Sequence, residues 1–82
     1  MSVSYTVSGM REAVAENVRI ELARRKMSAA ELARRLGVPP QNLSRRMTGE
    51  TPFDTDDLVQ IANEFGISVT ALLPVEQTAS AS

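Results

Sequence analysis

The chain has 82 residues, of which 43% are hydrophobic and 23% are charged, a composition typical of one small globular domain. It contains no cysteine and no histidine, which excludes disulfides, thiol chemistry and the usual zinc ligands. No apolar run is long enough for a membrane span or a signal peptide, so we expect a soluble, cytoplasmic protein.

The formal net charge of −1 conceals an uneven distribution along the chain. All nine basic residues lie between Arg11 and Arg46, where four glutamates oppose them, whereas six acidic residues and no basic residue follow. Two interpretations stay open from charge alone. The basic half forms a face that binds an acidic partner, or the helices carry solvated charges that happen to segregate.

The first predicted element is a short arm over residues 1–8, where apolar residues at positions 3, 5 and 7 alternate with polar ones. Such an arm is either flexible or paired with its copy in a dimer, because a lone strand has no partner in a helical chain. The first helix is expected over residues 9–26. Its apolar stripe recurs every four residues and consists of Met10, Val14, Val18 and Leu22.

Four further helix starts share one pattern, in which an apolar residue precedes the start and a leucine follows five residues after it. The pairs are Met27 with Leu32, Val38 with Leu43, Phe53 with Leu58, and Ile67 with Leu72. Ser28 and Glu31 match a capping box, and Asp54 is expected to cap the next helix.

Glycine and proline punctuate the ends of the predicted helices. Gly37, Gly49 and Gly66 follow last turns, and Pro74 closes the final helix. The expected helices cover residues 28–36, 40–47, 54–65 and 68–73, and the tail 75–82 is expected to be disordered. The pattern predicts an all-α domain of five helices over residues 9–74.

The predicted helices 28–36 and 40–47 are joined by only three residues, which predicts a helix-turn-helix unit. Helical periodicity places Leu43 and Met47 on the core side of the second of these helices. Its other side carries Gln41, Asn42, Ser44, Arg45 and Thr48, with Arg46 on the flank. Glutamine and arginine suit base edges, whereas hydroxyls and a flanking arginine suit phosphates. The alternative is a merely solvated amphipathic helix.

The segment "MSAAELARRLGVPPQNLSRRMTGETPFDTDDLVQIANEFGISVTALL" closely resembles the lambda-repressor-like (Cro/CI, XRE) helix-turn-helix domains of phages and bacteria. The pattern S-x-x-E-L-A-x-x-L-G-V, then L-S-R-R, then a glycine, then L-x-x-I-A-x-x-x-G-I-S-x-x-x-L-L runs from Ser28 to Leu73. With the first helix included, the resemblance covers about residues 10–74. It implies a compact five-helix domain with a short N-terminal arm, whose third helix enters the major groove of double-stranded DNA. It also implies a homodimer on a near-palindromic operator.

The resemblance also implies roles for individual residues. Pro40, Gln41 and Arg45 match base-contacting positions of the family, and Asn42 and Ser44 are added as base contacts from their place on the helix face, with Gln41 and Arg45 carrying most of the reading. Thr48 matches a position that the family commonly uses for phosphate, and the other expected phosphate contacts are Arg25, Ser28, Ala29 and Arg46. For Arg25, Ser28 and Arg46 the alternative is a surface residue without a DNA contact. Ala29 replaces the glutamine that many family members use to bind phosphate, so a contact there would come from the helix N-terminus. Pro40 has no hydrogen-bonding side chain and is expected to contact only a thymine methyl group or the backbone.

These features predict a small transcriptional regulator, a repressor or a Cro-like protein, that associates with the nucleoid. The alternative is an antitoxin-type module whose acidic half binds a basic protein partner, with DNA binding secondary. That half includes Glu50, Asp54, Asp56, Asp57 and Glu64. We expect no enzyme, no cofactor and no metal site, because no nucleophile–base pair, phosphate-binding glycine loop or metal-ligand spacing is present. A dimer is expected to use the arm or the last helix, with Ala71, Leu72 and Leu73.

Overall fold

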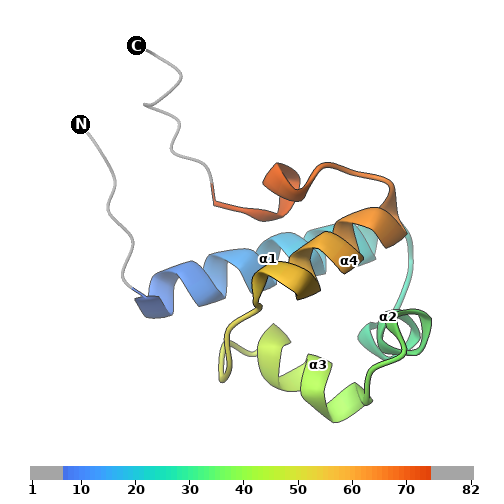
Figure 1. The fold of residues 1–82 in the computed structure, drawn as a ribbon, viewed down its shortest axis with the longest axis horizontal. Helices are drawn as coiled ribbons and strands as arrows, with labels where there is room; N and C mark the ends of the chain where they lie inside the picture. The colour runs from blue at the N-terminus through green and yellow to red at the C-terminus, as the bar shows by residue number, and fades with distance from the viewer. Residues whose placement is uncertain (1–6, 75–82) are drawn as a thin grey trace.

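The computed structural model describes residues 7–74, so the tail at 75–82 and most of the expected arm lie outside the described residues. The helices are α1 (Val7–Arg24), α2 (Ala29–Leu36), α3 (Pro40–Met47) and α4 (Thr55–Phe65), and the 3₁₀ turn η1 (Val69–Leu72) follows. In Figure 1, α2 and α3 form the lower part of the molecule and α1 and α4 lie above them. Residues 7–74 contain no strand, and the expected all-α class is confirmed.

The expected fifth α-helix over residues 68–73 is wrong, because this segment forms the 3₁₀ turn η1. Ser68 accepts a hydrogen bond from Thr70 N–H, and Ala71 N–H donates three residues back to Ser68 O at 3.0 Å. Leu73 is already extended, at φ −91° and ψ 146°. Pro74 disfavours the helical conformation at the residue before it, so too few residues are left for the α-helical hydrogen bonds to begin.

Helix α1 begins and ends two residues earlier than expected. Val7 and Ser8, which were expected in the arm, belong to its first turn. At the other end Lys26 adopts a left-handed conformation with φ 52°, and Met27 N–H donates to Leu22 O at 3.0 Å. This is the hydrogen bond of a Schellman cap, which glycine usually closes. Because lysine takes that position here, the sequence carries no signal for the stop.

The predicted helix caps are present, although one is incomplete. Asp54 accepts a bond from Asp57 N–H at 2.8 Å, and the Asp57 carboxylate accepts one from Asp54 N–H at 3.1 Å, so α4 begins with a full capping box. Ser28 Oγ accepts from Glu31 N–H at 3.0 Å. The Glu31 carboxylate does not complete that box, because it pairs with Arg34 and Arg35. Gly37 and Gly66 end their helices in the left-handed conformation, as predicted.

The core is built largely from the predicted apolar pairs. The leucine of each pair is buried, and each preceding apolar residue packs against the core from a partly buried position. Leu72 is fully buried, so it is not available for the expected dimer interface. Met10, expected in the buried stripe of α1, is 39% exposed. Asn17 of α1 donates to Leu72 O at 3.1 Å and joins the first helix to the last turn. Within residues 7–74, no helix has the length and apolar character needed to cross a bilayer.

Candidate nucleic-acid interface

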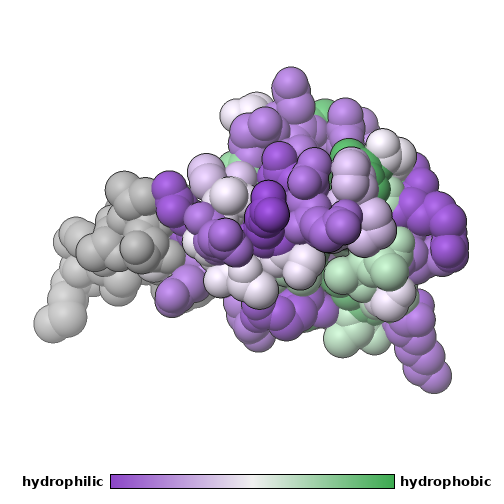
Figure 2. All heavy atoms as spheres, turned by 90° about the horizontal axis from the view of Figure 1, so that it is seen from below, coloured by the Kyte–Doolittle hydropathy of each residue, from purple (hydrophilic) through white to green (hydrophobic). Residues whose placement is uncertain are grey.

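Helix α3 has one buried and one exposed face. Leu43 and Met47 are 2% and 7% exposed and anchor the helix in the core, as predicted. The opposite face is exposed to solvent, and its residues are Gln41, Asn42, Ser44 and Arg45, with Thr48 just beyond the helix. Pro40 is exposed at the first helical position, on the side of Leu43 and Met47. Figure 2 views the molecule from the side of α2 and α3 and shows a surface made mostly of hydrophilic side chains. All five residues expected to contact bases are therefore exposed, and four of them share one face of α3.

The connection between α2 and α3 sets the position of this face. Helix α2 ends at Leu36, Gly37 reverses the chain with φ 74°, and Val38 N–H donates to Ala33 O at 3.0 Å. Pro39 precedes α3 and offers no side-chain cap, but its carbonyl accepts from Asn42 N–H at 3.0 Å. Pro40 stands at the first helical position, where a missing N–H costs nothing. The turn therefore brings the two short helices together as the predicted helix-turn-helix unit.

Arg45 combines a fixed main chain with a free side chain. Its carbonyl accepts bonds from Glu50 N–H at 3.0 Å, Thr51 N–H at 3.3 Å and Thr48 Oγ1 at 3.0 Å. The side chain is exposed, and no residue within the described range pairs with its guanidinium. Arginine presents two donors that match the two acceptors of guanine in the major groove. Arg45 is thus held in place while its charged end stays available to a ligand.

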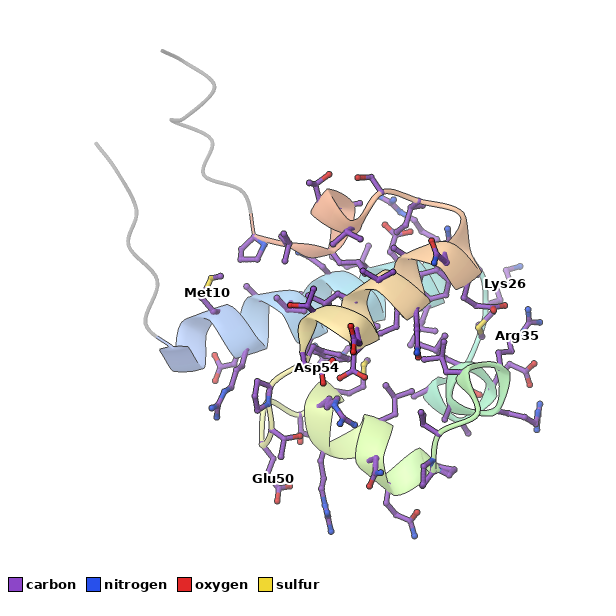
Figure 3. All side chains as sticks on the ribbon, in the orientation of Figure 1. Met10, Lys26, Arg35, Glu50 and Asp54 are labelled. Atoms are coloured by element: carbon purple, nitrogen blue, oxygen red, sulfur yellow. The ribbon has the colours of Figure 1, made fainter. Side chains whose placement is uncertain are left out.

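Arg46, the next residue, is engaged inside the protein. Its Nε lies 2.9 Å from Asp57 Oδ2, and its Nη1 donates to Asn42 O at 3.1 Å. Only 27% of its side chain is exposed. Asp57 belongs to the capping box of α4, and Figure 3 shows its partner Asp54 between α3 and the start of α4. The pair therefore joins the flank of α3 to the first turn of α4.

Arg25, a second expected phosphate contact, also has partners within the fold. Its Nη1 pairs with Glu21 Oε1 at 2.6 Å and its Nη2 donates to Phe65 O at 3.0 Å. The guanidinium also stacks 4.3 Å from the centre of the Phe65 ring. Glu21 is buried, and its carboxylate is compensated by this arginine together with Arg24, whose Nη1 lies 3.1 Å from Glu21 Oε2. These contacts tie the end of α1 to the end of α4.

The start of α2 carries two of the three remaining phosphate candidates, and the third is Thr48 just beyond α3. Ser28 is exposed, and its hydroxyl keeps a proton to donate while its oxygen caps the helix. It lines a shallow hollow together with Arg25 and the exposed Lys26. Ala29 is half-buried at the first helical position, so only its main chain suits an anion.

Glu50 borders the C-terminal end of the exposed face of α3, and Figure 3 shows it on the lower side of the molecule with α3.

Sequence reasoning missed Arg19. This α1 residue donates from Nη2 to Met47 O at 2.6 Å and from Nη1 to Glu16 Oε1 at 2.5 Å. It therefore satisfies a carbonyl at the end of α3, where a positive charge also complements the helix dipole. The only sequence signal was the spacing of Glu16 and Arg19 on one helix face, which says nothing about α3.

Comparison with known proteins agrees with this geometry. A helix-turn-helix family model matches residues 18–72, from the middle of α1 to the end of η1. The chain belongs to the helix-turn-helix family. The match confirms the resemblance to the Cro/CI, XRE class, whose domains bind double-stranded DNA. Among curated proteins, none matches this helix-turn-helix chain at a significant level.

Solved structures with a similar fold include HppE and a hypothetical transcription factor. Apo-HppE is 30% identical at a TM-score of 0.70, covering 79% of this chain and 36% of its own. Fe(II)-HppE with the alternative substrate (S)-1-HPP is 29% identical at a TM-score of 0.72, covering 87% and 35%. The hypothetical transcription factor NHTF from Neisseria is 20% identical at a TM-score of 0.76, covering 93% and 86%. This helix-turn-helix chain spans about a third of the HppE chains and most of NHTF.

Proposed function

We propose that this chain is a sequence-specific regulator of transcription that inserts α3 into the major groove of double-stranded DNA. One observation carries the proposal. The side chains of Gln41 and Arg45 are exposed on a single face, while Leu43 and Met47 hold the opposite face in the core. A two-turn helix anchored in this way offers base-reading groups to a groove at little cost in reorganisation.

The chemistry of each exposed side chain suggests its role in the complex. Gln41 pairs with the edge of adenine, and Arg45 pairs with O6 and N7 of guanine. Asn42 and Ser44 contact neighbouring base edges, and Pro40 contacts a thymine methyl group. Thr48, Ser28 and the main chain at Ala29 contact phosphates on either side of the groove. Arg25 and Arg46 are the exceptions among the expected contacts, since both have partners within the protein.

The finer features of the proposal are a homodimer and a near-palindromic operator. Two copies related by a two-fold axis would place their α3 helices in successive major grooves on one side of the duplex. Of the last-turn residues, Ala71 is exposed and Leu73 is half-buried, so both are candidates for the interface. Such a dimer would act in the cytoplasm as a repressor or Cro-like protein by occupying its operator. The residues named here act by binding, and we propose no catalytic role.

An antitoxin-type module is the second candidate, but the acidic residues on which it depends are partly engaged within the fold. Asp54 and Asp57 cap α4, and Glu64 pairs with Arg35 at 3.1 Å. Glu50 and Asp56 are the exposed acids in this half with no partner among the described residues. Since one fold hosts many functions, the choice rests on the exposed face of α3 rather than on architecture.

Selection of bound sequences from a random DNA pool tests the proposal directly. We expect enrichment of a motif with two half-sites whose centres lie about 10 base pairs apart, or a multiple of that distance. Gln41→Ala should lose preference at one position of each half-site while the rest of the motif is kept. Glu64→Gln, which leaves α3 untouched, serves as the control. A pool with no enrichment over scrambled duplex, even at low salt, would refute the proposal.

A further inference from the structure

We infer that Arg46 is a positioning residue whose ion pair with Asp57 sets the orientation of α3, and that it neutralises no phosphate in the complex. This inference rests on the proposed role of α3 as the recognition helix. It assigns different roles to two adjacent arginines. Arg45 is exposed and unpaired within the described range, whereas Arg46 is largely enclosed between α3 and α4.

The geometry holds Arg46 from two sides. Its Nε lies 2.9 Å from Asp57 Oδ2 in an ion pair without a hydrogen bond, and its Nη1 donates to Asn42 O at 3.1 Å, so the guanidinium spans the gap between α3 and α4. Asp57 is itself fixed, because its carboxylate accepts from Asp54 N–H while its own N–H donates to Asp54 Oδ1. With 27% and 22% of their side chains exposed, the two partners are only partly hydrated. The ion pair is therefore part of the capping structure of α4.

A phosphate contact would have to break this arrangement. If Arg46 turned toward DNA, Asp57 would keep a half-buried negative charge with no cation beside it. The protein would exchange one ion pair for another and gain little, because desolvation offsets the new attraction. An arginine that stays with Asp57 also releases no counter-ion from the DNA.

The Arg46–Asp57 ion pair affects recognition through the orientation of α3. The helix has only eight residues, and its core anchors Leu43 and Met47 lie along one line, about which a short helix can tilt or roll. Arg46 adds a restraint on the flank, off that line. Base reading needs side chains placed within about 0.5 Å and 10–20° of the productive geometry, so a lost flank restraint weakens specific contacts first. Arg19 holds only the last carbonyl of α3 and does not replace this restraint.

Asp57→Asn separates positioning from phosphate binding by the sign of its effect. Asparagine keeps an oxygen for Asp54 N–H, so the α4 cap is preserved while the charge is removed. If Arg46 positions α3, binding to the selected duplex weakens about fivefold to tenfold, the usual range for a coupled pair, and binding to random DNA barely changes. If Arg46 serves a phosphate, the freed guanidinium strengthens binding to both duplexes, which would overturn the inference.

Arg46→Lys gives a second test. Unlike Asp57→Asn, it does not place a neutral residue in the ion pair. Lysine keeps the charge but loses the planar guanidinium that pairs with Asp57 and donates to Asn42 O. Positioning predicts a loss on the selected duplex similar to that of Asp57→Asn, and a salt slope equal to that of the wild type. For Arg46→Ala, positioning again predicts an unchanged slope, whereas a lost phosphate contact lowers its magnitude by about 0.9. A lowered slope would overturn the inference.

The matched control is Glu64→Gln, which removes an ion pair between α2 and α4 that does not involve α3. It should leave the affinity for the selected duplex within about twofold, as expected for a partly exposed pair. Combining Arg46→Ala with Asp57→Asn should cost no more than either change alone; additive losses would count against the pair. If the wild type prefers no duplex, the proposed function fails and the inference falls with it. If the wild type prefers the selected duplex and the Asp57→Asn variant binds both duplexes more tightly, only the inference fails.

Discussion

Arg45→Ala is the sharpest test of the recognition helix, because the structure separates its effect on binding from its effect on stability. The guanidinium is exposed and unpaired within the described residues, so its removal breaks no contact of the free protein. The main-chain carbonyl that accepts from Glu50, Thr51 and Thr48 is kept by alanine. We therefore expect the free energy of unfolding to change by less than about 0.5 kcal/mol.

The size of the binding loss follows from the contact that Arg45 is proposed to make. A bidentate arginine–guanine pair contributes about 1–3 kcal/mol of discrimination against another base. A central value of about 2 kcal/mol corresponds to about a 30-fold increase in Kd on the selected duplex. On random DNA only a diffuse electrostatic attraction is lost, which we expect to amount to about twofold or threefold at moderate salt.

Fluorescence anisotropy at one fixed salt concentration would measure this difference. The titrations would use the selected duplex, a duplex in which the proposed guanine is replaced, and a random duplex. Arg24→Ala serves as a control of equal charge change, since Arg24 is 69% exposed near the end of α1 and its partner Glu21 keeps Arg25 as a counter-ion. The wild type should lose affinity when the guanine is replaced, and Arg45→Ala should not. An equal loss for Arg45→Ala on all three duplexes would remove Arg45 from base reading.

Three further changes test the scaffold by chemical denaturation. Arg19→Ala removes the donor to Met47 O. Because Arg19 is half exposed, the free energy of unfolding should fall by only about 1 kcal/mol. No change would show that this hydrogen bond is not formed in solution. Leu32→Ala deletes a fully buried side chain and should cost about 3 kcal/mol, whereas a cost below about 1 kcal/mol would contradict its place in the core. Gly66→Ala should lower the free energy of unfolding by about 1 kcal/mol, because φ is 70° at Gly66 and the space around it is open. Gly66→Asn should lose less, because asparagine tolerates this conformation better than alanine. Equal losses for the two variants would point to another cause.

The parts of the fold that depend on local chemistry were predictable from the sequence. The apolar residue before each helix start and the leucine after it located α2, α3 and α4, because capping and the hydrophobic staple act over a few residues. Gly37 and Gly66 marked two helix ends for the same reason. The end of α1 could not be located in this way, because Lys26 adopts a left-handed conformation that glycine usually takes. The last turn was misassigned because its length is limited by Pro74.

The division of roles among the arginines was not predictable in the same way. Arg45 and Arg46 are neighbours of one type, and helical periodicity places one on the open face and the other on its flank. Only the packing of α4 against that flank shows that Asp57 meets Arg46. Arg25 meets Phe65 across 40 residues of sequence and Arg19 meets Met47 O across 28, so no local pattern records either contact.

The three bonds that converge on the carbonyl of Arg45 have a consequence for how such a protein acquires a new operator. They fix the backbone at this position through atoms that every amino acid possesses, so the shape of the site does not depend on which side chain projects from it. Under the proposed role of Arg45, exchange at position 45 would change the preferred nucleotide without rebuilding the scaffold. A single codon there would then be enough to divert the domain to another promoter.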